Sequence, residues 1–470
     1  MLRAVRRVLL ALASLVVLVA FAAGARWLWI AVHVGAGYAA KVTCSLAHLS
    51  RYERGVIDAY VAAEVAPLGP ALAVSVTPAG AEASVLGGLV EARAVLRKDL
   101  GCTLAPAGPL RAEVGAAVEA LPPRPPRDPA RAWPDGEAAL AAPPPASVTR
   151  ALERAFEEPG PPHPLRRTTA VVVARDGRLV AERYAPGVDA DAPLLSWSMA
   201  KSVTMALVGT LVLDGRLVLE AEAPVPEWQA PGDPRAAITL DQLLRQSSGL
   251  AFDETYGAVN DVSRMLFTAA DTGAFAAAFP LAAEPEAVWS YSSGTSNIVA
   301  RIVRDAFGGD LAALVRFARA RLFDPAGMAS ALFESDASGT FIGSSFVFMT
   351  ARDWARFGEL FRRDGVWGGR RILPEGWVRY ASTPTPEAPL GRYGAHWWLN
   401  AGEPGAPERR AWPALPAESY AARGHSGQWV VIVPSVRLVV VRLGLTFPDN
   451  EDDGTQELVA ELLAAFEAAE

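Results

Sequence analysis

Cysteine, histidine and lysine are all scarce in this chain of 470 residues. It contains 2 cysteines and 5 scattered histidines. Too few thiolate and imidazole ligands lie near one another to predict a metal site, and no cofactor is expected. Clusters of basic residues are also missing, and the formal net charge is -7 at pH 7. Nucleic acid is therefore not an expected partner.

Lysine is so rare that its position carries information. Lys201 is the only lysine between Asp99 and Glu470, and every other cation in that stretch is an arginine. A general preference for arginine codons could explain the bias. An amine, however, can lose its proton near neutral pH when it is desolvated, whereas a guanidinium stays charged. Lys201 is thus a candidate general base.

A serine lies three residues before this lysine, in Ser198-Met199-Ala200-Lys201. Residues at this spacing share one face of a helix, and the apolar stripe that follows predicts a buried helix up to Leu213. Ser198 then lies at a helix N-terminus, where backbone N–H groups favour developing negative charge. The pair predicts a serine nucleophile with a built-in base. Chance, at about one serine in twenty positions, is the alternative.

Charge is also missing from a long run near the N-terminus. Three arginines precede an uncharged stretch from Val8 to Ala25, long enough to cross a bilayer with its N-terminus inside. Residues 1–25 are expected to be a transmembrane anchor, favoured by Trp27-Leu28-Trp29-Ile30, or a cleaved signal peptide, favoured by Ala23-Gly24-Ala25. In both cases the rest of the chain is exported. An anchor would hold it on the periplasmic side of the inner membrane.

The two cysteines, Cys44 and Cys102, both follow this apolar run. In an exported chain such a pair predicts a disulfide, with two buried thiols as the alternative. Short apolar runs separated by glycines predict a small α+β module over residues 26–117. Residues 118–147 are rich in proline and are expected to form an extended linker or a wrapping segment.

From residue 148 to residue 470, strands frame a middle that is mostly helical. The expected elements are a helix at Val148 to Glu158, strands at Thr168 to Arg175, Arg178 to Tyr184, Trp429 to Val433 and Leu438 to Leu445, and a helix at Glu457 to Phe466. The turn Asp176-Gly177 is a strong hairpin signal. We expect an α+β fold in which both ends build one antiparallel sheet flanked by helices, with a mostly helical subdomain beside it.

Two further motifs follow Ser198 and Lys201. Tyr291 lies in Trp289-Ser290-Tyr291-Ser292-Ser293, which is typical of a loop that presents a phenol, although ordinary packing is the alternative. His425-Ser426-Gly427 precedes the strand at Trp429 to Val433. In this order the motifs resemble the serine β-lactamase and penicillin-binding protein superfamily. The class C-like branch, with its esterases, D-amino-acid peptidases and 6-aminohexanoate-dimer hydrolases, is the most similar part.

The resemblance covers roughly residues 148 to 470 and implies a β-lactamase/transpeptidase-like fold. It also implies acyl transfer through an ester on Ser198, with Lys201 and Tyr291 as general base and acid. The remaining implied roles are an oxyanion hole from the N–H groups of Ser198 and Gln428, and substrate contacts or hydrogen-bond support from His425, Ser426, Gly427 and Ser293.

Two departures from the superfamily pattern bear on the substrate. Ser293 stands where β-lactamases often have asparagine, and His425 stands where they have a lysine that contacts a substrate carboxylate. A neutral imidazole supplies that charge poorly, so small esters or amides are expected rather than β-lactams. Tyr256, in a stretch similar to a substrate-covering loop, is a candidate binding residue, with a plain surface loop as the alternative.

Three other functions stay open on the sequence. The first two are penicillin binding and D-amino-acid peptidase or β-lactamase activity. The third is a membrane-bound receptor that is acylated by its ligand but does not turn over. The sequence does not indicate the natural substrate or the oligomeric state.

Overall fold

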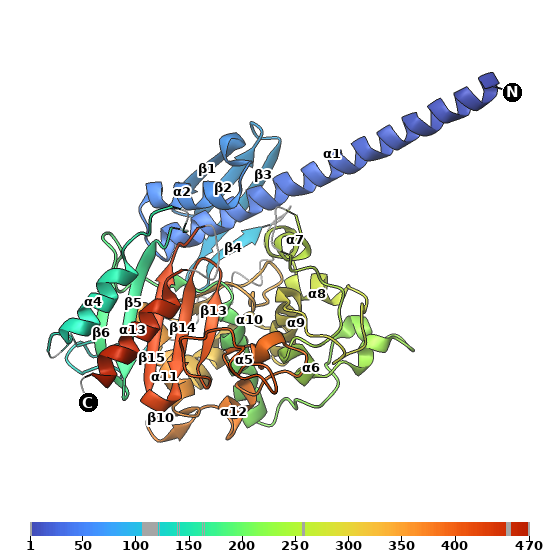
Figure 1. The fold of residues 1–470 in the computed structure, drawn as a ribbon. Coiled ribbons are helices and arrows are strands. Elements are labelled where there is room, and N and C mark those ends of the chain that lie inside the picture. The colour runs from blue at the N-terminus through green and yellow to red at the C-terminus, as the bar shows by residue number, and fades with distance from the viewer. Residues whose placement is uncertain are drawn as a thin grey trace.

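A six-stranded antiparallel sheet organises the larger part of the chain (Figure 1). The computed structural model describes residues 2–105, 121, 123–138, 140, 142–161, 163, 165–255, 259–447 and 453–468. The strand order is β12-β13-β14-β15-β5-β6. The strands are β5 (Thr168–Arg175), β6 (Arg178–Tyr184), β12 (Trp398–Leu399), β13 (Tyr420–Gly424), β14 (Gln428–Val433) and β15 (Leu438–Gly444). The expected sheet, built from both ends of the region, is confirmed.

Helices cover both faces of this sheet, which explains why its central strands are apolar along their whole length. One face carries α4 (Ala146–Ala155) and α13 (Thr455–Glu467), and the other carries α5 (Met199–Leu213) and α11 (Ala351–Arg362). Gly358 lets α11 approach closely, since a Cβ there would lie 2.6 Å from a methyl group of Val439. The hairpin turn has positive φ at both Asp176 and Gly177, as a tight two-residue turn requires.

A helical subdomain lies beside the sheet, and α5 separates the two. Because it is covered from all sides, nearly all of α5 is buried. The subdomain helices are α6 (Leu240–Leu244), α7 (Asp261–Thr268), α8 (Thr272–Ala277), α9 (Ser293–Asp305) and α10 (Leu311–Ala318). Smaller elements are β7 (Leu194–Leu195), β8 (Leu332–Phe333), β9 (Val347–Met349), β10 (Val366–Trp367), β11 (Arg370–Arg371) and α12 (Trp377–Ala381).

The N-terminal part forms a small α+β module. Its four-stranded antiparallel sheet has the order β1-β2-β3-β4 and packs on the C-terminal half of α1. The elements are α1 (Leu2–His48), α2 (Arg54–Glu64), β1 (Leu72–Thr77), β2 (Gly80–Val85), β3 (Val90–Arg97) and β4 (Gly101–Ala105). The expected disulfide between Cys44 and Cys102 is present and joins α1 to β4.

The module and the body share one hydrophobic core, and α1 lies between them. A Cβ at Gly37 would come within 2.1 Å of the Phe267 carbonyl oxygen in α7, so only glycine allows this approach. Lys41 of α1 forms a fully buried ion pair with Glu334, whose carboxylate also accepts a bond from Ser45 Oγ at 2.9 Å. These contacts fix the module against the body.

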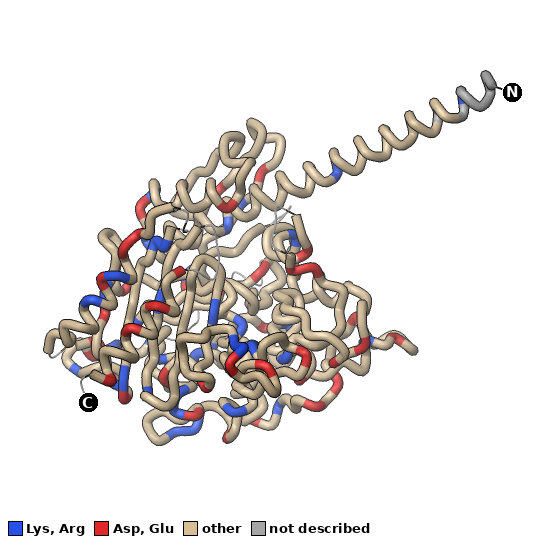
Figure 2. Tube along the Cα trace, viewed as in Figure 1, with Lys and Arg blue, Asp and Glu red and all other residues tan. Residues whose placement is uncertain are grey.

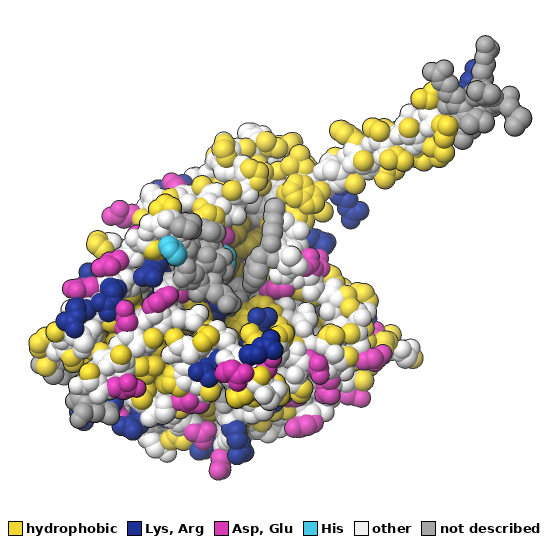
Figure 3. Space-filling model, in the orientation of Figure 1, with side chains coloured by type: hydrophobic (Ala, Val, Ile, Leu, Met, Phe, Trp, Pro, Cys, Tyr) yellow, Lys and Arg dark blue, Asp and Glu magenta, His cyan; other side chains and the backbone are white. Residues whose placement is uncertain are grey.

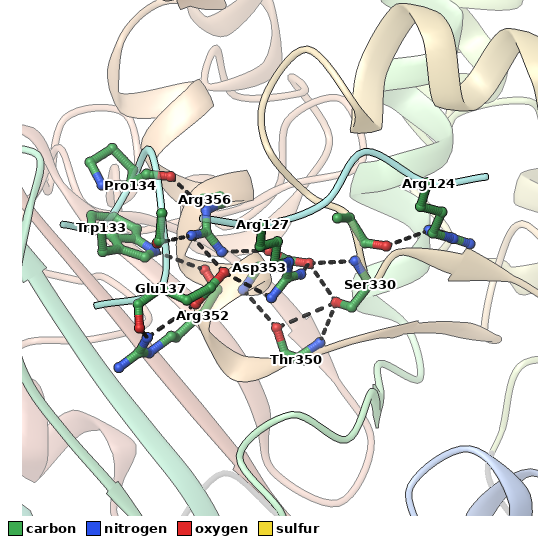
Figure 4. Close-up of polar contacts among 12 residues, drawn as sticks. Arg124, Arg127, Trp133, Pro134, Glu137, Ser330, Thr350, Arg352, Asp353 and Arg356 are labelled. Atoms are coloured by element: carbon green, nitrogen blue, oxygen red, sulfur yellow. Dashed lines mark hydrogen bonds and ion pairs between the residues drawn. The ribbon is translucent and has the colours of Figure 1, made fainter. Parts of the chain in front are cut away.

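The described part of the proline-rich segment wraps around α11 (Figure 4). Arg356 on α11 donates from Nε to the Pro134 carbonyl at 2.9 Å and from Nη2 to the Gly136 carbonyl at 2.7 Å. The Trp133 indole is 3% exposed and donates to the Arg352 carbonyl at 3.3 Å. Residues 123–138 are therefore held along the body.

The N-terminal half of α1 projects from the body (Figure 1). Within the described residues, α1 is the one helix that is long and apolar enough to cross a membrane, and the candidate segment is Leu12–His48. The projecting part carries few charges (Figure 2), and apolar side chains cover it (Figure 3). The helix is continuous past Ala25, without a break at the expected segment boundary.

Candidate active site

Ser198 stands at the start of α5, as the spacing of the Ser-x-x-Lys motif predicts. It is the N-cap residue, but its side chain makes no capping bond. Instead, Ser198 Oγ accepts a hydrogen bond from Lys201 Nζ at 3.0 Å. The hydroxyl is therefore free of the helix end and directed to the amine.

The residue before Ser198 has an uncommon backbone conformation. Trp197 has φ 43°, a region that bulky residues rarely occupy. Its side chain is buried against Phe346 and the His425 ring, with ring centroids 5.5 and 5.4 Å away. Its indole N–H also donates to the Tyr60 hydroxyl at 3.1 Å. Packing on several sides stabilises this strained turn and so fixes the position of Ser198.

Lys201 is buried at the centre of the site. Besides Ser198, its Nζ donates to Ser293 Oγ at 3.0 Å and to the Ser344 carbonyl at 3.3 Å. It also lies 4.6 Å from the ring centroid of Tyr291. Burial lowers the pKa of Lys201 to about 8, although the negative charge of Glu254 opposes this shift. An appreciable fraction of the amine is therefore neutral near neutral pH, as a general base requires.

Glu254 is a site residue that the sequence did not single out. Its carboxylate accepts bonds from Ser293 Oγ at 2.6 Å and from the Ser293 N–H at 2.9 Å. Burial raises the pKa of Glu254, while the charge of Lys201 lowers it. Lys201, Ser293 and Glu254 thus form a hydrogen-bonded chain. A lone acidic residue in a loop gives no pattern by which this contact could have been found.

Tyr291 precedes α9 and lies in an aromatic cluster. Its ring centroid is 5.2 Å from that of Trp398 and 5.8 Å from that of Tyr393. Its ring lies beside the Lys201 amine, and Tyr291 and Ser198 line one cavity. Tyr256 lies outside the described residues.

The end of β13 runs beside the nucleophile. A Cβ at Gly424 would lie 2.2 Å from the Ser196 carbonyl oxygen and 2.9 Å from the Ser198 nitrogen, so only glycine fits there. His425, Ser426 and Gly427 then form the turn between β13 and β14. Strand β13 ends at Gly424 and β14 begins at Gln428, so the triplet lies just before a strand, as its place in the sequence predicts.

The rest of this turn faces away from Ser198. Ser426 Oγ and the Tyr60 hydroxyl of α2 are 2.8 Å apart. The Gly427 carbonyl accepts from Arg442 at 2.6 Å. Gln428 pairs with Gly424 in the sheet, and its side-chain amide donates to three backbone carbonyls. The structure thus brings His425 to the cavity beside Ser198, whereas Ser426 and Gly427 build the turn and Gln428 begins β14.

The N-terminal module reaches into the site through α2. Glu64 Oε1 lies 2.9 Å from His425 Nε2, and the side chains of both residues are mostly buried. Together with Tyr60, this gives α2 two contacts to the turn that follows Gly424. Both contacts join residues more than 300 positions apart in the sequence, so no local pattern could indicate them.

His396 supports the first turn of α5, which follows Ser198. Its Nδ1 lies 3.0 Å from the Lys201 carbonyl, and its Nε2 lies 3.0 Å from the Gln246 amide nitrogen and 3.2 Å from Ser296 Oγ. Burial, together with the charge of Lys201, lowers the pKa of His396 to about 3. The ring is therefore neutral and holds the first turn of α5 in place.

A polar cavity of about 280 Å³ opens on one side of Ser198. Its lining residues are Ser198, Glu254, Trp289, Tyr291, Arg392, Trp398, Arg423, Gly424 and His425. Two arginines, Arg392 and Arg423, are therefore among the residues that line the cavity, although the resemblance implies a site without the usual positive charge. Among the described residues, no cluster of histidine, cysteine and carboxylate side chains could hold a metal ion.

Most of the chain, including Ser198, Lys201 and Tyr291, matches a known protein family. The family model described as Beta-lactamase matches residues 152–465. The chain belongs to the Beta-lactamase family. Its first 151 residues, with the N-terminal module, lie outside this match.

One curated protein and two solved structures illustrate what this chain is similar to. A 6-aminohexanoate-dimer hydrolase of Paenarthrobacter ureafaciens is 26% identical over 60% of this chain and 74% of its own length. A candidate 6-aminohexanoate-dimer hydrolase from Bacillus anthracis is 23% identical, with a TM-score of 0.53 over 65% of this chain and 80% of that one. A family VIII carboxylesterase is 16% identical, with a TM-score of 0.50 over 69% of this chain and 99% of that one. The two solved structures share the fold.

Proposed function

We propose that this chain is a serine hydrolase that cleaves small esters or amides through a covalent acyl-enzyme. The observation that carries the proposal is the buried Lys201 amine within 3.0 Å of Ser198 Oγ, with its pKa lowered to about 8. Such an amine can take the serine proton and so activate the hydroxyl. Membership of the Beta-lactamase family, which includes hydrolases, supports the same chemistry.

Acylation begins when Lys201 takes the proton of Ser198. The Oγ atom then bonds to the substrate carbonyl carbon and forms a tetrahedral oxyanion. When that intermediate collapses, the bond to the alcohol or amine breaks, and the leaving group receives a proton from Lys201 by way of Tyr291. A water molecule, deprotonated by Lys201, next attacks the ester carbonyl. The serine leaves with its proton restored, and the acid is released.

Two backbone N–H groups stabilise the oxyanion in this mechanism. The first is that of Ser198, at the positive end of α5. For the second we choose His425 in place of Gln428, because the preceding residue, Gly424, passes so close to Ser198 that a Cβ there would lie 2.9 Å from the Ser198 nitrogen. One such donor is typically worth about 3 kcal/mol to the transition state. The Glu64 carboxylate and the Trp197 ring hold the His425 side chain, which supports the position of that N–H group.

A labelling experiment tests the nucleophile. A fluorophosphonate probe should add one phosphonyl group to the full chain, because Ser198 Oγ displaces fluoride, and intact mass would report the adduct. Ser198→Ala should abolish labelling. Ser435→Ala, in the β14–β15 connection and far from the site, should leave it unchanged. An adduct of the same yield on Ser198→Ala would disprove the proposed nucleophile, and labelling without turnover of p-nitrophenyl acetate would favour the acylated receptor.

Penicillin binding or β-lactamase activity is a second candidate, because Arg392 and Arg423 line the polar cavity. A guanidinium can bind the carboxylate that β-lactams carry, in place of the lysine that the family often uses. Competition distinguishes the candidates. If penicillin G slows fluorophosphonate labelling at micromolar concentration, the site binds β-lactams, and nitrocefin turnover would show hydrolysis. Ester turnover without either effect would leave the esterase or amidase function alone.

A further inference from the structure

A second cavity opens on the other side of Ser198, and we call it the apolar pocket. It has a volume of about 210 Å³ and also reaches Ser293, Ser345 and His425. Its apolar walls include Trp27, Leu28, Ala31 and Val34 of α1, and Leu266 and Phe267 of α7. The nucleophile therefore stands between a polar cavity with two arginines and a pocket whose far end is apolar.

One face of α1 forms the length of this pocket. Trp27, Ala31, Val34 and Tyr38 follow one another at spacings of three or four residues and so lie on the same side of the helix. At 1.5 Å per residue, this stripe is about 16 Å long. Trp27 is 52% exposed, whereas Ala31 and Val34 are 5% and 6% exposed. The pocket thus runs from an open mouth at Trp27, past the buried Ala31 and Val34, to a deep end at the half-buried Ser198.

The mouth lies where α1 leaves the body. N-terminal to it, large apolar side chains from Leu9 to Phe21 are exposed on the projecting helix (Figure 3). Trp27 and Trp29 are each about half exposed at the base of this segment, a position typical of tryptophans at a membrane–water interface. If α1 spans a bilayer, the mouth of the pocket therefore faces the lipid boundary.

We propose that the apolar pocket holds the acyl chain of an amphiphilic ester or amide that enters from the bilayer. This inference rests on the proposed hydrolase function and names its substrate class. Ser198 Oγ would form its ester with the acyl carbon at the deep end of the pocket. The alcohol or amine, with the proton delivered by Lys201, would leave through the polar cavity, where the arginines favour an anionic head group.

The walls from α1 and α2 lie outside the residues that match the Beta-lactamase family. The module would therefore add chain-length selectivity to the hydrolase domain.

The test uses the full chain in phosphatidylcholine vesicles, with p-nitrophenyl acetate and p-nitrophenyl laurate as substrates. The wild type should have a higher kcat/KM for laurate. Ala31→Trp would fill the pocket, so the laurate-to-acetate ratio should fall by roughly 10-fold or more, since each lost methylene contact weakens binding. Leu266→Trp, on the opposite wall, should have the same effect. His33→Trp places an indole on another side of α1 and is the matched control, with an unchanged ratio.

The possible results distinguish failure of the acyl-chain pocket from failure of the proposed hydrolase function. If the wild type hydrolyses acetate but not laurate, or if Ala31→Trp and Leu266→Trp lower both activities equally, the acyl-chain pocket is wrong while the hydrolase function stands. If neither substrate is turned over and Ser198 is not labelled by a fluorophosphonate, the proposed function itself fails. A ratio that falls in both pocket variants and not in His33→Trp supports the inference, even if one of the two variants folds poorly.

Discussion

At the scale of single residues, the proposed chemistry depends on whether the Lys201 amine is neutral or protonated. Lys201 is 1% exposed, so little solvent stabilises the charge of its amine, which donates to two serine hydroxyls and one backbone carbonyl. The Glu254 carboxylate acts on the amine through its charge. Burial outweighs the carboxylate, so the pKa falls to about 8. An arginine in the same place would remain charged and could not accept the serine proton.

The first prediction is that kcat/KM depends on pH through the protonation of one base, Lys201. Because only neutral Lys201 accepts the Ser198 proton, kcat/KM for p-nitrophenyl acetate should fall as the pH drops below about 8 and level off above it. Lys201→Arg should lower kcat/KM by roughly 100-fold or more. Initial rates corrected for spontaneous hydrolysis would measure both. A flat wild-type profile across the neutral range would refute the role of Lys201 as base.

The second prediction concerns Glu254, whose charge raises the pKa of Lys201. Glu254→Gln keeps an acceptor for Ser293 but removes the charge, so the midpoint of the kcat/KM profile should move to lower pH. Asp253→Asn removes a neighbouring, exposed carboxylate and is the control, with no shift expected. A midpoint that stays in place or rises in Glu254→Gln would show that the carboxylate does not act on Lys201.

At the scale of elements, features that depend on neighbouring residues could be predicted from the sequence, whereas close approaches between separate segments could not. The hairpin around Asp176-Gly177 and the start of α5 were predictable, since each depends on turn chemistry or spacing within a few residues. The sequence places the triplet at His425 just before a strand, and the structure has it in the turn that leads into β14. No motif indicated that Gly424 passes so close to Ser198 that a Cβ there would lie 2.9 Å from the Ser198 nitrogen.

Contacts between distant elements could not be predicted at all. Tyr60 of α2 lies 2.8 Å from Ser426 Oγ and accepts from the Trp197 indole at 3.1 Å. No periodicity or motif marks either pairing, because the α2 pattern shows only which face is buried. The site is nevertheless completed by this helix, which lies outside the Beta-lactamase match.

The third prediction tests this link between α2 and the nucleophile. Tyr60→Phe leaves the buried Trp197 indole N–H without its acceptor, which should cost about 1–3 kcal/mol of stability. Because Trp197 precedes Ser198, kcat should also fall while KM changes little. Tyr52→Phe removes a hydroxyl from the same module, away from Ser198, and should leave kcat unchanged. Thermal melts and steady-state kinetics on both variants would separate the effects. Equal losses of kcat in the two would argue against a positioning role.

At the scale of the whole molecule, α1 has two halves with different surroundings. The C-terminal half is buried between the module and the body, where Lys41 pairs with Glu334 and Cys44 with Cys102. The N-terminal half is exposed and apolar, with no described contact to the body. We propose that this half anchors the enzyme in the membrane, and that residues 26–117 serve as a spacer that also shapes the site.

The fourth prediction follows from this division. Removing residues 1–25 takes away the projecting apolar part of α1 together with its three arginines and none of the core, so the shortened chain should fold, keep its activity on p-nitrophenyl acetate within about 2-fold and no longer sediment with phosphatidylcholine vesicles. The full chain should sediment even at high salt, because apolar insertion is not screened as surface charge is. The control is Leu15→Arg with Val19→Arg, which keeps the length of α1 but places two charges in the apolar stretch. That variant should lose vesicle binding as the truncation does, since a charge at the bilayer centre costs about 3 kcal/mol. If the truncated chain still sediments, the body itself binds the membrane and α1 is not the anchor.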